Sequence, residues 1–272
     1  MGTLIAAYRD MIEDGFHRRR FDRFDQYLTD DYHVVDLARP DRQGGRDGTQ
    51  AHIEGLLERF RDVRYEIIDA FEVGDKMAVR FVVTGRDADG KRLVSPGMSL
   101  HHGRGGLLRR SWHLGDQRDL GVAFDDEPAP ELVDRWGGNV LRSGGPLATR
   151  YFLAVDRLWG VARPVGDLAH PDYVGWDPFA ARGTGASSID RFHEGLRAQY
   201  EQPLYEVLDT FEVKDWLATR FMVRGLHHGE LATILGLSMN QFREGRLLKG
   251  NVFCRYGRLS GVAQAVGEAL AS

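Results

Sequence analysis

The pattern of apolar and polar residues predicts two copies of one arrangement of helices and strands. Apolar residues recur at helical spacing over 4–12 and again over 151–159, which predicts an amphipathic helix at the start of each copy. Runs rich in β-branched and aromatic residues at 78–84 and 218–224 are typical of strands. The chain therefore predicts helices first and strands afterwards, twice over.

Further elements follow the same order. A second helix is predicted over 52–60 in the first copy and over 189–200 in the second. Two more strands of the first copy, 97–102 and 107–116, flank a glycine-rich turn. Helices followed by an antiparallel meander indicate an α+β fold, in which the helices cover one face of a curved sheet.

A direct repeat in the sequence supports this division. Residues 65–87 and 205–227 are identical at 12 of 23 positions without a gap, where about one or two identities are expected by chance. The chain therefore reads as a tandem duplication. We expect a first domain over 1–125, a linker rich in proline and glycine over 126–145, and a second domain over 146–272.

Composition and charge narrow the class of partner. The chain is 42% hydrophobic and 28% charged, as in ordinary globular proteins, and its formal charge of −4 argues against a nucleic-acid partner. Cys254 is the single cysteine, so no intrachain disulfide is possible. No apolar run is long enough to cross a bilayer and no signal peptide is recognised, which favours a cytoplasmic protein without a membrane partner.

Both copies resemble a known family. The motifs are the phrase that ends at Asp36, the strand 78–81, the segment 97–100 and the tail from Trp112 to Asp116. They resemble the SnoaL-like polyketide cyclases of the nuclear-transport-factor-2-like (NTF2-like, cystatin-like) superfamily. The resemblance implies two tandem cone-shaped α+β domains. It also implies a cofactor-free cyclase in which an aspartate on the last strand handles the proton.

The residues of the last strand suggest how that aspartate would act. Side chains two apart point the same way along a strand, so Trp112 and Leu114 are predicted to form an apolar collar below Asp116. Desolvation raises the pKa of such a carboxyl group towards the range of a general base. His102, at the end of the preceding strand, is a candidate proton shuttle. The alternatives are a surface turn for Asp116 and an exposed hairpin position for His102.

A second candidate site involves paired carboxylates. Asp36 and Asp177 occupy matching places in the two copies, and the resemblance to epoxide-handling relatives implies that Asp36 acts with Glu66. Alternatively, each aspartate fixes the following loop through hydrogen bonds to the backbone. Tyr32, shortly before Asp36, is a candidate ligand-binding residue. The histidine pairs lack the spacing of a zinc site, so neither a metal nor another cofactor is expected.

The two copies differ where chemistry is expected. Compared without a gap, the second copy has Tyr256 at the place of Asp116, which makes the first cone the working one. The second would then be a packing partner or a binding pocket, with Tyr256 and Asp177 as ligand-binding residues. The duplication would supply within one chain the dimer interface that single-domain relatives form, and a further homodimer stays open.

The preferred function is a cofactor-independent cyclase or isomerase that acts on a small hydrophobic, polyketide-like carbonyl compound by acid–base catalysis. One alternative is an epoxide hydrolase or epoxide-opening cyclase that uses Asp36 and Glu66. The other is a non-catalytic protein that binds a small molecule or acts as a scaffold.

Overall fold

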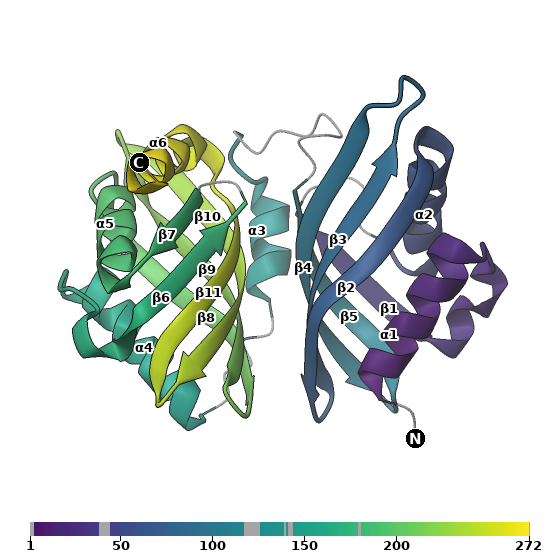
Figure 1. Ribbon diagram of the computed structural model, residues 1–272, viewed down its shortest axis with the longest axis horizontal. Coiled ribbons are helices and arrows are strands. Elements are labelled where there is room, and N and C mark those ends of the chain that lie inside the picture. Colours follow the sequence, from purple (N-terminus) through teal and green to yellow (C-terminus); the bar gives the residue numbers. More distant parts are fainter. Residues whose placement is uncertain are drawn as a thin grey trace. The chain divides into compact units, whose positions relative to one another are not determined.

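The chain forms two units, Met1–Val122 and Ala123–Ser272, and each is built on its own sheet (Figure 1). The computed structural model describes residues 3–37, 44–116, 126–138, 140, 144–178 and 181–271. In each unit helices cover the concave face of the curved sheet, and in the second unit one further helix, Pro130–Gly137, lies against the other face (Figure 1). The predicted class, two tandem α+β domains, is therefore confirmed.

The first unit places its helices against a five-stranded sheet. In chain order its elements are α1 (Leu4–Ile12), β1 (Leu28–Asp36), α2 (Arg46–Arg59), β2 (Arg61–Val73), β3 (Lys76–Arg86), β4 (Arg92–Arg104) and β5 (Leu107–Gly115). The strand order is β1-β5-β4-β3-β2, and β1 runs parallel to β5 while the other neighbours are antiparallel. The sequence predicts a purely antiparallel sheet, and this prediction is wrong at β1. The exposed Asp30 and Asp31 interrupt the apolar pattern there, so the strand is not evident from the sequence.

The second unit repeats this topology with one added strand. Its elements are α3 (Pro130–Gly137), α4 (Pro146–Val155), β6 (Ala169–Asp177), β7 (Ala181–Thr184), α5 (Ala186–Arg197), β8 (Glu201–Val213), β9 (Trp216–His227), β10 (Glu230–Arg243), β11 (Arg246–Arg255) and α6 (Ser260–Ala271). The order is β7-β6-β11-β10-β9-β8, in which β6 runs parallel to β11 as β1 does to β5. The same mixed sheet thus occurs twice.

A glutamate of the sequence repeat anchors α1 in the first unit and the corresponding helix α4 in the second. Glu72 Oε2 accepts the backbone N–H of Ile5 at 2.8 Å, and Glu212 Oε2 accepts that of Ala148 at 2.8 Å. Both bonds satisfy donors in the first helical turn, which have no partner inside the helix. The negative charge also lies at the positive end of the helix dipole. This shared anchor explains why the repeat keeps glutamate at this position.

Each sheet has a glycine beneath an aromatic ring on its concave face. Phe81 pairs directly with Gly97, and Phe221 pairs with Gly236. A Cβ atom at Gly97 would lie 2.2 Å from Phe81 Cζ, and one at Gly236 would lie 2.1 Å from Phe221 Cζ. Only glycine therefore lets the ring lie across the neighbouring strand.

Helix α3 lies in the segment predicted as a linker, and it packs against the second sheet. Trp136 is fully buried and its Nε1–H donates to the carbonyl oxygen of Phe221 at 3.0 Å. Arg220 Nη2 donates to the carbonyl of Gly138 at 3.2 Å. These contacts make α3 a part of the second unit.

Helices α1 and α4 each end in a wider turn. A π-helical turn, Glu13–His17, continues α1, and another, Asp156–Gly160, continues α4. These turns carry Phe16 and Trp159 into the interior of their units. Across the described ranges, no helix combines the length and apolarity that a membrane span requires.

Candidate functional site

The helices and concave sheet of the first unit enclose a cavity of about 110 Å³. Its walls come from α1, α2 and all five strands, and they combine aliphatic and aromatic side chains with polar ones. The polar side chains that line it are Tyr8, Tyr32, Asp36, Thr49, His52, Tyr65, Ser95, His101, Ser111 and His113. Concave apolar sites with a few convergent polar groups are the usual form of small-molecule sites.

His101 on β4 lies at the centre of a chain of hydrogen-bonded side chains. Its Nδ1 is 2.6 Å from Ser111 Oγ, and its Nε2 is 2.7 Å from Ser99 Oγ. The Tyr32 hydroxyl donates to Ser111 Oγ at 3.0 Å. Burial, with a smaller effect of neighbouring histidines, lowers the pKa of His101 to about 3. The imidazole is therefore neutral near pH 7, so one nitrogen donates and the other accepts.

Two tyrosines extend this polar group from the helix side. The hydroxyls of Tyr8 on α1 and Tyr65 on β2 lie 2.5 Å apart. The Tyr8 ring also packs against the His101 ring, with centroids 4.8 Å apart. Burial raises the pKa of Tyr8 to about 12. Both phenols therefore stay protonated at neutral pH, and because one donates to the other, one phenol proton is left for a further partner.

Asp36 and His113 are neighbours across the parallel pair β1 and β5. They are register partners, and both side chains line the cavity. The His113 ring stacks on Phe81 with centroids 5.0 Å apart, and Asp36 is buried. Since paired strands lie about 4.8 Å apart, a carboxylate and an imidazole on facing positions reach the same part of the cavity.

The direction predicted for the side chains of the last strand is wrong by one residue. Ser111 and His113 line the cavity, so Trp112 and Leu114 project from the opposite face of β5, where both are fully buried. They do not form an apolar collar inside the cone. Side chains of β5 alternate between the two faces of the sheet, and the sequence alone does not show which of the two sets faces the cavity.

Asp116 follows the end of β5. Its backbone N–H donates to the Pro96 carbonyl at 2.7 Å, and its own carbonyl accepts from Ser95 Oγ at 2.5 Å. The residue is buried, but it is not among the described residues that line the cavity. Its observed contacts join the ends of β4 and β5, so its predicted role as the general base stays a prediction.

The other catalytic candidates from the sequence are spread over both faces of the sheet. His102 packs edge-on against Trp112, with centroids 4.8 Å apart, on the face away from His101. Glu66 is exposed, whereas its neighbour Tyr65 lines the cavity. Asp36 faces the cavity, so the expected pair of Asp36 with Glu66 does not form, because the two carboxylates project from opposite faces.

Sequence reasoning missed the residues that the structure brings together. Tyr32 and Asp36 were expected, but Ser99, His101, Ser111 and His113 were not chosen. An alternating polar pattern was present in both strands, Ser-x-His at 99–101 and Ser-x-His at 111–113. In a half-buried strand such residues share one face, so this pattern was the available signal.

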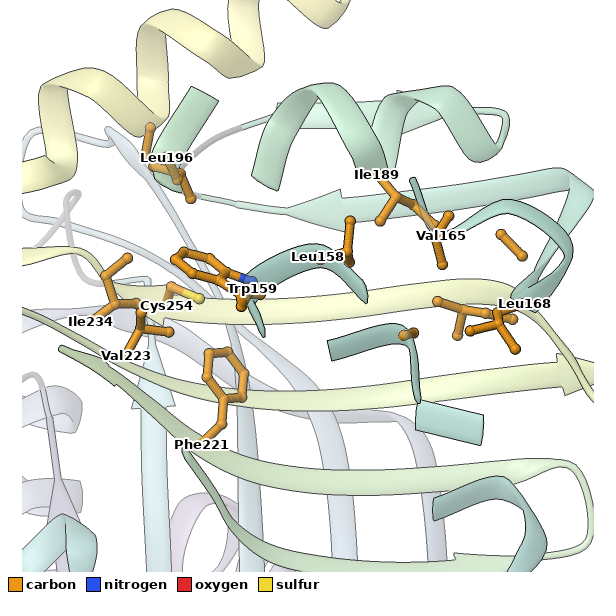
Figure 2. Close-up of a cluster of buried hydrophobic side chains, with 14 of the residues drawn as sticks. Leu158, Trp159, Val165, Leu168, Ile189, Leu196, Phe221, Val223, Ile234 and Cys254 are labelled. Carbon is orange, nitrogen blue, oxygen red and sulfur yellow. The ribbon is translucent and has the colours of Figure 1, made fainter. Parts of the chain in front are cut away.

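The second unit encloses a cavity of about 130 Å³ with more apolar walls. Figure 2 shows its aliphatic and aromatic lining: Leu196 and Ile189 lie on the helix side, Ile234, Val223 and Phe221 on the sheet side, and Trp159 between them. The tyrosine pair recurs, since the hydroxyls of Tyr151 and Tyr205 lie 3.0 Å apart. Each unit thus contains a cavity of its own, and the two cavities have the tyrosine pair in common.

A buried carboxylate also lies in this second cavity. The Tyr256 hydroxyl donates to Asp177 Oδ2 at 2.5 Å, and both residues line the cavity together with Cys254. Burial, and next the negative charge of Asp177, raises the pKa of the Cys254 thiol well above its ordinary value. The expected loss of an ionisable group from the second cone is therefore wrong, because Asp177 supplies one. The structure brings the predicted pair Asp177 and Tyr256 together.

Strand pairing corrects the comparison between the copies. One row across the first sheet contains Phe81, Gly97 and Gly115, and the matching row of the second contains Phe221, Gly236 and Cys254. Cys254 therefore matches Gly115, and Arg255 matches Asp116. The ungapped match of Tyr256 to Asp116 is one residue out, because the β9–β10 hairpin is one residue shorter than the β3–β4 hairpin.

With this register, the two cavities differ at their polar positions. The second copy has Asn240, Gly250 and Val252 where the first has His101, Ser111 and His113, respectively. The first cavity is thus the one with the imidazole–hydroxyl chain. In the described part of the chain, His, Cys, Asp and Glu side chains do not gather in groups of three or more that would hold a metal ion.

Two mixed sheets, each curved around helices and an internal cavity, define a tandem α+β protein. Residues 8–111, which lie within the first unit, match the family model described as the SnoaL-like domain. No curated protein matches the chain.

Several solved structures are similar to part of the chain. IdmH from Streptomyces antibioticus, described as a candidate polyketide cyclase, has 16% identity and a TM-score of 0.39 over 44% of this chain and 99% of its own. TsrD from Streptomyces laurentii has 21% identity and a TM-score of 0.37 over 43% and 97%. An NTF2-like protein from Burkholderia pseudomallei has 17% identity and a TM-score of 0.38 over 44% and 95%.

Proposed function

We propose that the first unit is a cofactor-independent cyclase or isomerase that moves a proton next to the carbonyl group of a small, largely apolar, polyketide-like compound. The observation that carries this proposal is the joint exposure of Asp36 and His113 to a cavity that also contains a neutral His101. The SnoaL-like match of residues 8–111 agrees with this class of reaction.

Asp36 and His113 form the proposed base. One of them accepts a proton from the carbon beside the substrate carbonyl, and the pair holds this proton until it returns to carbon or oxygen. His113 is the proposed acceptor because a neutral imidazole has a lone pair on one ring nitrogen that can take up the proton. The Asp36 carboxylate stabilises the imidazolium that forms, since opposite charges this close favour the charged state.

The substrate oxygen is proposed to lie against the hydroxyl chain. Ser111 supplies a neutral donor held in a fixed position: when its oxygen accepts from Tyr32 and from His101 Nδ1–H, its own hydroxyl proton is left for the substrate oxygen. Removal of the proton from carbon places negative charge on that oxygen. Donors that are oriented in advance stabilise such charge without reorganising. The cavity of about 110 Å³ also restricts the conformations of the bound molecule, which favours ring closure by proximity.

The test measures deuterium incorporation at the carbon beside the carbonyl of indanone in deuterium oxide, followed by NMR. We expect Asp36→Asn and His113→Val each to lower the exchange rate of the full-length protein by about 100-fold or more. His113→Val introduces the residue that the second copy carries at this place. Asp116→Asn and Glu66→Gln serve as matched controls, because neither side chain lines the cavity, and we expect both to keep the wild-type rate.

Two outcomes would contradict the assignment. Loss of exchange in Asp116→Asn with normal exchange in Asp36→Asn would return the role of base to Asp116. Saturable binding of indanone without any exchange above the rate in buffer would favour the non-catalytic alternative, in which the cavity only holds a ligand.

A further inference from the structure

The second cavity has an arrangement of polar groups that the first lacks. At one end of an apolar volume of about 130 Å³, the Tyr256 hydroxyl donates to Asp177 Oδ2 at 2.5 Å. Asp177 is 7% exposed and Tyr256 is 2% exposed. Asp177 lines the cavity, and a carboxylate has lone pairs for several donors, so a bound molecule that brings a donor can add a hydrogen bond to those that Asp177 already accepts.

The same cavity keeps a carboxylate, Asp177, at the place of Asp36, but it has no imidazole at the places of His101 and His113. Val252 and Asn240 stand at the places of His113 and His101, respectively. His193 does line the cavity, but its Nδ1 accepts the indole N–H of Trp159 at 3.0 Å. Burial also lowers the pKa of His193 to about 4. These features suit binding of a ligand rather than transfer of a proton to an imidazole.

The size and the walls define the ligand further. An apolar protein cavity of about 150 Å³ accommodates a benzene-sized molecule, so about 130 Å³ fits a single aromatic ring. Leu158, Ile189 and Phe221 contribute to a wall without charge (Figure 2). Arg182 lines the same cavity and is exposed, which disfavours a cationic ligand. A neutral ring with one hydroxyl group satisfies all three conditions.

We propose that the cavity of the second unit is a binding site for small neutral phenols, whose hydroxyl group donates to the Asp177 carboxylate. Helix α6 completes this site, since Gly267 and Leu270 line the cavity from the helix that follows β11. The proposal concerns the second unit alone and does not depend on catalysis in the first.

The experiment compares phenol with anisole, which has the same ring but no hydroxyl donor. Binding to the full-length protein is followed by quenching of tryptophan fluorescence, because Trp159 and Trp176 line the cavity. We expect phenol to bind about tenfold more tightly than anisole or better, as hydrogen bonds to charged groups do. In Asp177→Asn we expect this preference to fall below about threefold, because the carboxamide accepts a weaker hydrogen bond.

Two further variants make the assignment specific. Tyr256→Phe removes one of the internal partners of Asp177, so we expect phenol to bind at least as tightly as in the wild type. Asp36→Asn changes the matching carboxylate of the first cavity, and we expect the affinity for phenol to stay unchanged. Thermal melting with and without phenol shows whether each variant is folded and whether it gains stability from the ligand.

Three results would overturn the proposal. Equal affinity of the wild type for phenol and anisole would show that the phenol hydroxyl makes no contact that contributes to binding. Loss of phenol binding in Tyr256→Phe with normal binding in Asp177→Asn would make the tyrosine the contact group instead. Weakened binding in Asp36→Asn alone would place the phenol in the first cavity.

Discussion

The hydroxyl groups of Tyr8 and Tyr65 lie 2.5 Å apart in the first cavity, and those of Tyr151 and Tyr205 repeat this contact at 3.0 Å in the second. Each pair joins α1 or its counterpart α4 to the first long strand of the repeated sequence. The pairs survive while His101 and His113 of the first cavity have no counterpart in the second. The contact therefore belongs to the shared construction of the units.

Removing the two hydroxyls of the first pair should have unequal effects. The Tyr8 hydroxyl interacts with both Tyr65 and Ser99, so Tyr65→Phe leaves it a partner and should cost about 0.5–1.5 kcal/mol. Tyr8→Phe leaves the Tyr65 hydroxyl without Tyr8 and should cost about 1–3 kcal/mol. Urea unfolding of both single variants and the double variant measures this. A double loss equal to the sum of the single losses would show that the hydroxyls are not coupled.

The neutral state of His101 should make the protein less stable in mild acid. Burial lowers its pKa from 6.5 to about 3, so below pH 6.5 the unfolded chain takes up a proton that the folded chain does not. The stability that depends on neutral His101 is therefore fully present above pH 6.5 and is lost as the pH falls towards 3. Between pH 7 and pH 5 this histidine alone should remove about 2 kcal/mol.

His101→Asn provides the control, because Asn240 stands at the matching place of the second unit. We expect the variant to lose less free energy of unfolding between pH 7 and pH 5 than the wild type, by about 2 kcal/mol. His193, whose pKa is lowered to about 4, keeps part of the pH dependence in both proteins. An unchanged pH dependence in His101→Asn would mean that this imidazole is accessible to protons in the folded state.

The ring over Gly97 should make this position intolerant of any side chain. In Gly97→Ala the new Cβ would lie 2.2 Å from Phe81 Cζ, and the forced shift should cost about 1–3 kcal/mol. Gly115→Ala is the matched control, since its Cβ would lie 3.4 Å from the nearest atom, His113 Nε2. Chemical denaturation should place Gly115→Ala within about 0.5 kcal/mol of the wild type. Equal losses would rule out the ring contact as the cause.

Trp136 should contribute to the stability of the second unit although it lies in the segment expected to be a linker. Trp136→Ala removes a fully buried indole and should cost about 3–5 kcal/mol. Trp136→Phe keeps much of the packing but loses the donor to the Phe221 carbonyl, which should cost about 1–2 kcal/mol. Hydrogen exchange should show the loss of protection in β9. Wild-type protection of β9 in Trp136→Ala would contradict the packing of α3 on this sheet.

Much of the fold follows from local pattern. The stripe that includes Leu4, Tyr8 and Met11 is buried in α1 as its spacing predicts. Strand β1 was not predicted because its pattern is mixed, with Asp30 and Asp31 exposed near its middle. Its parallel pairing with β5 joins residues far apart in the chain, and such a pairing has no local signal.

The candidate site was harder to predict, because a shift of one residue turns a strand's side chains to the opposite face. The predicted residues His102 and Trp112 lie on the face of β4 and β5 that points away from the cavity, whereas His101 and Ser111 lie on the cavity face. The same sensitivity affected the comparison of the copies, where the shorter β9–β10 hairpin moves the match from Tyr256 to Arg255. The strand pairing in the structure shows which face each side chain occupies and which residues of the two copies match, whereas composition and spacing do not.

The repetition within one chain also has a genetic consequence. In an assembly of identical subunits, one codon change alters every copy of a cavity at once. Here the two cavities are encoded separately, so a substitution at His113 leaves Val252 untouched. Every molecule is translated with one cavity of each kind, in a fixed ratio of one to one, and selection acts on each without disturbing the other.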